Sequence, residues 1–303
     1  MKAAAPLRGT QSLVGQMGWV FERPSLTALE LGWRWLFGIP FLAVCWFRVQ
    51  VMFDKHELYV SGLPSIDFQN PWVASVQLAH ACSLYRPVLV EAFAWLMPSA
   101  ALAWVVISGL GRSLVFKRLD PMLPFRPLRM MVLQAAWLAL FCATWWGWLC
   151  AMQWVASTHI TTGAEPDLVG YSMWAIFLSL GFFTAWALLS WPFTIAPLIA
   201  SLEDEDTALS ALGQSFQLGK VFSGKLIEIN LVMGIVNLAL IVVAMVLSAA
   251  PLPFSDQLGP DAMYSVWAVA TVFYLVASDY FQVVRLKGLL EFWKMFRGGL
   301  AEG

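Results

Sequence analysis

The sequence predicts an all-α polytopic membrane protein, a transmembrane helical bundle with about six spans. Of its 303 residues, 60% are apolar and 12% are charged, whereas soluble domains have roughly 45–50% and 25%. The charged residues also leave long uncharged stretches. A helix of about 20 apolar residues crosses a hydrocarbon core of roughly 30 Å, so each such stretch is a candidate span.

The first half of the sequence contains three of these stretches. Residues 31–51 form the first, with Arg34 and Arg48 near its ends, where long side chains can reach the headgroups. Residues 88–111 and 130–156 form the second and third. Each is long enough to cross a bilayer as one helix.

The second half contains the other three. The fourth span, 168–195, begins an uncharged stretch too long for one straight crossing, so we expect Pro192 and Pro197 to kink it or to turn its end along the interface. The fifth and sixth spans are predicted at 227–249 and 262–284.

The distribution of Lys and Arg predicts that both termini are cytoplasmic, because basic residues favour the cytoplasmic connections. The basic residues of alternate connections are Lys2, Arg8 and Arg23; Arg112, Lys117, Arg118, Arg126 and Arg129; Lys220 and Lys225; and Arg285, Lys287, Lys294 and Arg297. The opposite side has only Arg48, Lys55 and Arg86. We therefore expect a bacterial inner-membrane protein.

This orientation divides a single transmembrane domain, 1–303, into segments. The cytoplasmic ones are an N-terminal segment (1–30), an amphipathic elbow (203–225) and a tail (285–303), and the main external one is a loop (52–87). Within that loop, 71–85 is apolar enough for a re-entrant or interfacial helix. A polar stretch precedes each odd-numbered span, which favours three two-helix units.

The sequence of the elbow predicts a short helix that lies on the inner membrane surface. Asp206 or Thr207 would cap its start, and Gly219 would end it. Its apolar face would consist of Leu209, Leu212 and Phe216. The acidic run 203–206 just before it is expected to stabilise the helix N-terminus, with a divalent ion or partner contact as the alternative.

The sequence from the elbow into the fifth span, 207–236, resembles several multi-pass families, including the membrane domain of bacterial glycerophosphodiester phosphodiesterases and Yip1-like proteins. The resemblance rests on Ala208, Leu209, Ser215, Leu218 and Gly219. It implies a surface elbow before a membrane span. It implies no phosphodiesterase activity, because no catalytic domain accompanies it.

Three ionisable residues are predicted to lie in the inner third of the membrane: Arg34, Glu228 and Asp279. An unpaired charge at that depth is poorly compensated, so we expect Arg34 to pair with Asp279 or Glu228. Such a pair would act as a structural clamp. The alternative is that Asp279 and Tyr280 belong to a proton or solute path.

A strip of small residues follows the third span at a spacing of four: Ala135, Ala139, Ala143, Gly147 and Ala151. Small residues let membrane helices approach closely. The strip predicts close helix packing, either inside the chain or with a membrane-protein partner or a second copy. The neighbouring Trp145, Trp146 and Trp148 favour a rigid packing surface over a pigment pocket.

The sequence predicts neither a cofactor nor a metal site. His56, His80 and His159 are far apart and lack paired ligand spacing. No nucleotide-binding, hydrolase or zinc-protease motif is present, and no catalytic residue is assigned. Net charge is near zero, with 18 Lys and Arg against 19 Asp and Glu, so nucleic acid is not an expected partner.

These observations favour a non-enzymatic protein of the lipid bilayer that organises a membrane complex or local lipid. A permease or transport subunit is the alternative, because the fourth span is interrupted and ionisable groups are predicted in the membrane. An intramembrane lipid-modifying enzyme is the third hypothesis.

Overall fold

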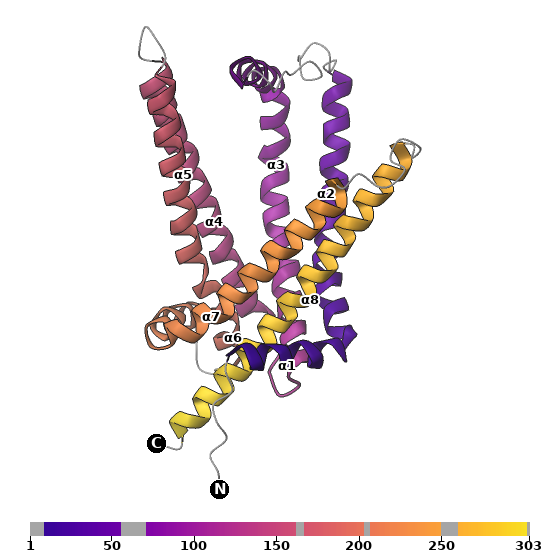
Figure 1. The fold of residues 1–303 in the computed structure, drawn as a ribbon, viewed down its shortest axis with the longest axis vertical. Helices are drawn as coiled ribbons and strands as arrows, with labels where there is room; N and C mark the ends of the chain where they lie inside the picture. Colours follow the sequence, from indigo (N-terminus) through magenta and orange to yellow (C-terminus); the bar gives the residue numbers. More distant parts are fainter. Residues whose placement is uncertain (1–8, 56–70, 162–166, 203–206, 250–259, 302–303) are drawn as a thin grey trace. The chain divides into compact units, whose positions relative to one another are not determined.

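A computed structural model of the chain describes residues 9–55, 71–161, 167–202, 207–249 and 260–301 (Figure 1). These residues are almost entirely helical and contain no strand, which confirms the all-α class. The elements are α1 (Gly9–Phe21), α2 (Pro24–Lys55), α3 (Pro71–Leu119), α4 (Pro127–Ala156), a π-helical turn η2 (Ser157–Thr161), α5 (Leu168–Ser190), α6 (Pro192–Leu202), α7 (Ala208–Ala249) and α8 (Pro260–Ala301).

Five segments in the described residues are long and apolar enough to cross a membrane. They are Pro24–Val51, Val90–Leu119, Pro127–Ile160, Leu168–Leu202 and Tyr264–Glu291, and they coincide with five of the predicted spans. The remaining predicted span, 227–249, lies in α7, where the described apolar segment Val232–Val246 is shorter than a full crossing. The chain is therefore a polytopic helical membrane protein.

Proline begins several of these helices, including α2 at Pro24, α4 at Pro127 and α6 at Pro192. Proline suits the first helical position because its missing N–H would have no intrahelical partner there. The predicted break in the fourth span occurs at Trp191, where α5 gives way to α6. Pro197 lies inside α6, which continues to Leu202, so a kink at this residue stays a prediction.

Part of the predicted external loop 52–87 is helical. Residues 52–55 end α2, and residues 71–87 begin the 49-residue helix α3, which continues into the second span. Figure 1 shows that the first turns of α3 lie across the direction of the rest of the helix. Pro87 and Pro98 are inside α3, and an internal proline bends a helix because it removes a backbone hydrogen bond.

The predicted elbow is not a separate helix. The helix α7 runs from Ala208 to Ala249 without interruption, so Gly219 does not end it. Thr207 caps the start of α7, as its hydroxyl accepts a hydrogen bond from the Ser210 N–H at 3.2 Å. Asp206 and the rest of the acidic run lie outside the described residues.

By its internal contacts the chain divides into two compact units. Unit 1 contains residues 1–32 and 109–303, and unit 2 contains residues 33–108. In unit 2, α2 packs on α3 through aromatic contacts: Trp104 lies 5.8 Å from Trp33 and 5.1 Å from Phe37, between ring centroids. In unit 1, α4 packs on α5 and α7 packs on α8. In unit 1, α7 also packs on α6 and α1 packs on α8, so the three two-helix units stay a prediction.

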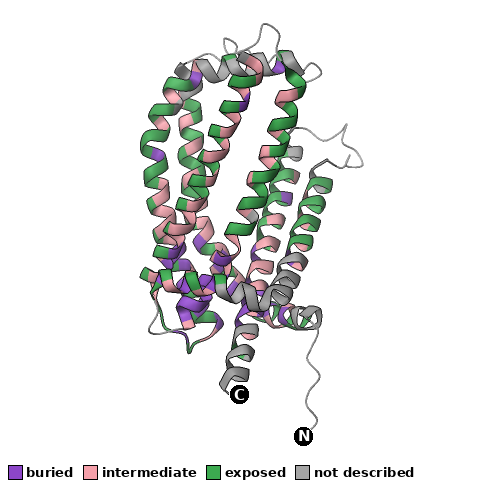
Figure 2. Cartoon of the chain, turned by 90° about the vertical axis from the view of Figure 1, so that its left-hand side faces the viewer, coloured by how far each residue is buried: buried purple, intermediate pink, exposed green. Residues whose placement is uncertain are grey.

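The core of unit 1 lies where α6 meets its neighbours. Nearly all of α6 is buried, from Ile195 to Ser201, against α4 and α7. The end of α3 contributes Val115 and Phe116, and α8 contributes Val283 and Leu290, all at most 2% exposed. Figure 2 shows the buried segments gathered at this end, whereas exposed segments dominate along the spans. The packing of this unit is thus concentrated at one end of its helices.

Candidate functional site: a cation-rich helix junction

Charged and polar side chains gather at the same end of unit 1 as the core. We call this region the junction; it consists of Gln16, Trp19, Arg23, Glu30, Arg112, Ser113, Lys117, Arg118, Asp120, Arg126, Lys287, Glu291 and Lys294. It includes the second half of α1 and the residue just before α2, the first turns of α2, the end of α3 and the loop up to α4, and the C-terminal half of α8. These are the segments whose basic residues predicted a cytoplasmic location.

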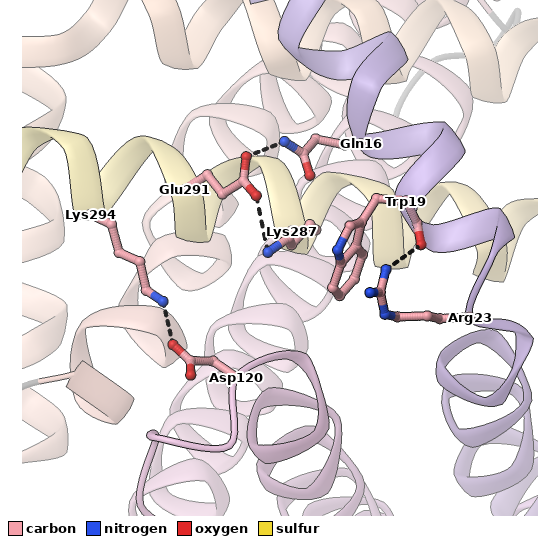
Figure 3. A network of polar contacts seen from close by, with 7 residues as sticks. All are labelled: Gln16, Trp19, Arg23, Asp120, Lys287, Glu291 and Lys294. Atoms are coloured by element: carbon pink, nitrogen blue, oxygen red, sulfur yellow. Dashed lines mark hydrogen bonds and ion pairs between the residues drawn. The ribbon is translucent and has the colours of Figure 1, made fainter.

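The helix α1 is held on α8 by stacked and hydrogen-bonded groups (Figure 3). The Trp19 ring has the Arg23 guanidinium at 4.0 Å and the Lys287 ammonium at 4.2 Å from its centroid. Two cations on one indole are stabilised by its π electrons. Beside them, Lys287 pairs with Glu291 at 3.0 Å, and the Gln16 amide donates to the same carboxylate.

A second contact joins the loop after α3 to α8. Asp120 pairs with Lys294 (Figure 3) and accepts a hydrogen bond from the Met122 N–H at 3.0 Å. The bond from Lys294, followed by that backbone bond, outweighs partial burial and holds the pKa of Asp120 below its ordinary value. The carboxylate therefore stays ionised and is occupied by a partner from another helix.

Arg126 connects α3, α4 and α6. Its backbone N–H donates to the Ser113 hydroxyl at 3.0 Å, and its guanidinium donates to the Ala200 carbonyl at 3.3 Å. Carbonyls in the last turn of a helix lack intrahelical partners, so an arginine there stabilises the end of α6. Burial lowers the pKa of Arg126, although the group remains a cation at neutral pH.

A buried ion pair lies at the start of α2. The side chain of Glu30 is 0% exposed, and its Oε1 is 3.8 Å from Nη1 of Arg112, which is 17% exposed. Sequence analysis missed Glu30 because it lies next to the boundary drawn for the first span. The sequence did offer a signal for this residue: Glu30 is a charged residue at the start of an apolar helix, four residues before Arg34.

The junction also contains a cavity of about 550 Å³, lined by Arg23, Ser25, Leu26, Leu29, Leu114, Lys117, Arg118 and Pro121. Three of these residues are cations, and three are leucines. They come from the residue just before α2, from the first turns of α2, and from the end of α3 and the loop after it. Such a lining can accept a ligand that has an anionic part and an apolar part.

The three ionisable residues predicted to lie in the membrane are Arg34, Glu228 and Asp279, and the described contacts do not show whether they pair. Arg34 is in unit 2, with its guanidinium 5.3 Å from the Trp33 ring centroid. Asp279 is in unit 1 and only 3% exposed, and the side chain of Glu228 lies outside the described residues. The clamp between them therefore stays a prediction. Tyr280, considered for a path, donates to the Met17 carbonyl at 2.8 Å and so ties α8 to α1.

The small-residue strip occupies two environments on α4. Ala135, Ala139 and Ala143 are exposed, whereas Gly147 and Ala151 are half-buried. A methyl group at Gly147 would lie 3.1 Å from the Phe182 ring of α5, so glycine permits this close approach. Whether the exposed part contacts a partner stays a prediction.

The aromatic residues of α4 and α5 line a groove of about 380 Å³, formed by Phe141, Thr144, Trp145, Trp148, Ser179, Phe182, Phe183 and Trp186. The indole N–H of Trp148 donates to the Ser179 hydroxyl at 3.0 Å. Trp148 therefore packs between the helices, while Trp146 is 70% exposed.

At the far end of these helices, His159 in η2 lies 3.2 Å from the Asp167 carboxylate. Asp167 also caps α5 by accepting the Gly170 N–H at 2.9 Å, and this bond, followed by the His159 contact, lowers the pKa of Asp167. His80 is exposed in α3, and His56 lies outside the described residues. Among the described residues no three His, Cys, Asp or Glu side chains gather as metal ligands.

No family model matches the chain, and no curated protein or solved structure is significantly similar to it. The resemblance of 207–236 to multi-pass families therefore stays a prediction. The class of the protein follows from its own structure: it is an integral membrane helical bundle with a cation-rich junction at one end of its spans.

Proposed function

We propose that this chain is a non-enzymatic protein of the bacterial inner membrane that organises its surrounding lipid and membrane partners, with both termini and the junction on the cytoplasmic side. One observation carries the proposal: the apolar side chains along the spans face outward while the cations gather at one end. In the most apolar 18-residue stretch of each of the α4 and α5 spans, none of the residues that the structure describes is buried.

The outward faces support a role in contacts with the bilayer. Ile176, Phe183 and Trp146 are each at least 68% exposed, which in a membrane means contact with acyl chains or a partner helix. Apolar residues in a bilayer need no burial inside the protein, because lipid tails are equally apolar.

The junction supports the proposed orientation and a preference for anionic lipid. Basic side chains near the ends of spans are favoured on the cytoplasmic side. There they also attract negatively charged headgroups, and each contributes about 1 kcal/mol near the surface.

Purification from native membranes in a mild detergent tests this function. We expect the chain to retain anionic phospholipid above its membrane abundance, or to retain a stoichiometric membrane-protein partner, both measured by mass spectrometry. A pure, monodisperse monomer with lipid in bulk proportions would contradict the proposal.

The exposed part of the small-residue strip provides a sharper version of the experiment. Replacing Ala139 and Ala143 by Leu should release a partner that packs closely on α4, because larger side chains prevent close helix approach. The matched control replaces Cys142 and Cys150, also exposed on α4, by Leu. Equal partner recovery from both variants would exclude the strip as the contact.

A permease or transport subunit is the second candidate. It is favoured by two carboxylates that are buried within spans, Glu30 and Asp279, because ionisable groups in membranes often belong to transport paths. Solute-dependent thermal stabilisation of the purified protein would support it, since a ligand of the folded state raises apparent stability. The same purified sample serves for both measurements.

A further inference from the structure

We propose that the cavity between the start of α2 and the end of α3 is a binding site for a phosphate-bearing anion, with an anionic phospholipid headgroup as the ligand class. This inference rests on the proposed function and deepens it by naming the site. The site consists of Arg23, Lys117 and Arg118 around Leu26, Leu29 and Leu114.

The position of the cavity favours a ligand from the headgroup layer. The first candidate span begins at Pro24, one residue after Arg23. The second ends at Leu119, one residue after Arg118. The three cations therefore lie at the ends of two spans, at the depth where phosphate groups of one leaflet are found.

Arg23 is held in place before any ligand binds. Its guanidinium stacks on Trp19 and donates to the Trp19 carbonyl at 3.2 Å. A guanidinium has five N–H donors, and this bond uses one of them. A pre-positioned arginine loses little conformational freedom on binding, and its planar fork matches two oxygens of a phosphate.

Lys117 and Arg118 are exposed and occupy the last turn of α3, where cations also stabilise the helix C-terminus. That local role does not account for Arg23, which comes from a different segment and lines the same cavity. The nearby carboxylate of Asp120 forms an ion pair with Lys294. Its negative charge is therefore offset by Lys294 and not by the cations that line the cavity.

The leucines give the cavity an apolar side. Leu26 is 1% exposed and forms part of the core, while Leu114 is 44% exposed at the rim. A volume of about 550 Å³ lies within the range of about 300–1,000 Å³ that is usual for small-molecule sites. The cations fit a phosphate, and the leucines fit the glycerol and first methylenes of a lipid.

The test uses the full-length protein in nanodiscs of phosphatidylcholine with increasing phosphatidylglycerol. The variant replaces Lys117 and Arg118 by Gln, because both are exposed and their loss should leave the fold intact. The control replaces Arg48 and Arg86 by Gln, which removes the same charge from the other ends of the spans. Headgroup binding is measured by native mass spectrometry and by thermal unfolding.

We expect the Lys117/Arg118 variant to bind phosphatidylglycerol about 25-fold more weakly than wild type, since each basic residue contributes about fivefold. The control should stay within about twofold of wild type. Replacing Arg23 by Lys should also weaken binding, because an ammonium keeps the charge but not the planar fork.

Inorganic phosphate and glycerol phosphate, added to nanodiscs of phosphatidylcholine alone, identify the source of the ligand. Stabilisation by these soluble anions, lost in the Lys117/Arg118 variant, would support the site with a water-soluble ligand. Stabilisation by phosphatidylglycerol alone would support the lipid.

Equal binding by wild type, the Lys117/Arg118 variant and the control would overturn the site. If wild type still enriches anionic lipid in that case, the proposed function stands and only this cavity is excluded. If wild type enriches no anionic lipid and retains no partner, the proposed function fails as well.

Discussion

The junction and the α4–α5 hairpin belong to the same compact unit, yet they bury their side chains to very different extents. Residues Ile195–Ser201 of α6, which pack beside the junction, are all buried. By contrast, none of the described residues is buried in the most apolar 18-residue stretches of the α4 and α5 spans. The junction lies at span ends, where water and headgroups compete for polar groups, so it needs internal partners. The spans face hydrocarbon, which accepts apolar side chains without internal packing.

Breaking the Glu30–Arg112 pair should produce the largest effect at the junction. Replacing Glu30 by Leu leaves the Arg112 cation without this partner, which typically costs about 3–5 kcal/mol of unfolding free energy. The double replacement Glu30→Leu with Arg112→Met should cost less, because neither member of this pair is then left without the other. Thermal unfolding in detergent measures both; a double variant less stable than the single would contradict this account.

Ile199 and Ile176 compare the two regions directly with the same side chain. Ile199 in α6 is 0% exposed, and Ile176 in α5 is 70% exposed. Replacing Ile199 by Ala should reduce the free energy of unfolding by about 2–5 kcal/mol, while Ile176→Ala should change it by about 0.5 kcal/mol or less. Similar losses for the two variants would show that α5 is packed as tightly at Ile176 as α6 is at Ile199.

Two helical glycines test close approach. A methyl group at Gly109 of α3 would lie 2.9 Å from the backbone N of Met131, whereas one at Gly181 of α5 meets nothing within 4 Å. We expect Gly109→Ala to destabilise by about 1–3 kcal/mol through overpacking. Gly181→Ala should stabilise by up to about 1 kcal/mol through helix propensity. The opposite order would refute the contact of α3 with α4.

Acidification should weaken the junction by a small amount through Asp120. Its folded-state pKa is below the ordinary 3.8, so the pair with Lys294 contributes fully above that value and is lost as pH falls through the folded pKa. Lys294 is half exposed, so the contribution is about 0–1 kcal/mol. The difference in stability between wild type and Asp120→Asn should disappear at low pH; a constant difference would contradict this.

The interruption of the fourth span illustrates what a local signal predicts well. Pro192 lacks the N–H that a helix interior requires, so α5 ends just before it. Gly219 illustrates the opposite case. Glycine lowers helix propensity by only about 1 kcal/mol, and the flanking sequence keeps α7 helical through it.

The ionisable residues show why the candidate site was harder to predict than the fold. Lys and Arg counts identified the segments that form the junction, because the position of a charge along the chain is readable directly. The sequence did not show which residues pair with these cations. Glu30 and Arg112 are 82 residues apart in the sequence, and Asp120 and Lys294 are 174 residues apart. Periodicity and spacing contain no information about which distant helices meet.

The amino-acid sequence by itself determined the helical membrane class, the approximate limits of the spans and the concentration of cations at alternate connections. These depend on length, hydropathy and local backbone chemistry. Only the tertiary structure decided that α6 is buried among α4 and α7, that Trp19 lies between Arg23 and Lys287, and that three cations and three leucines line one cavity. Those features depend on contacts between residues far apart in the chain, which are set by packing in three dimensions.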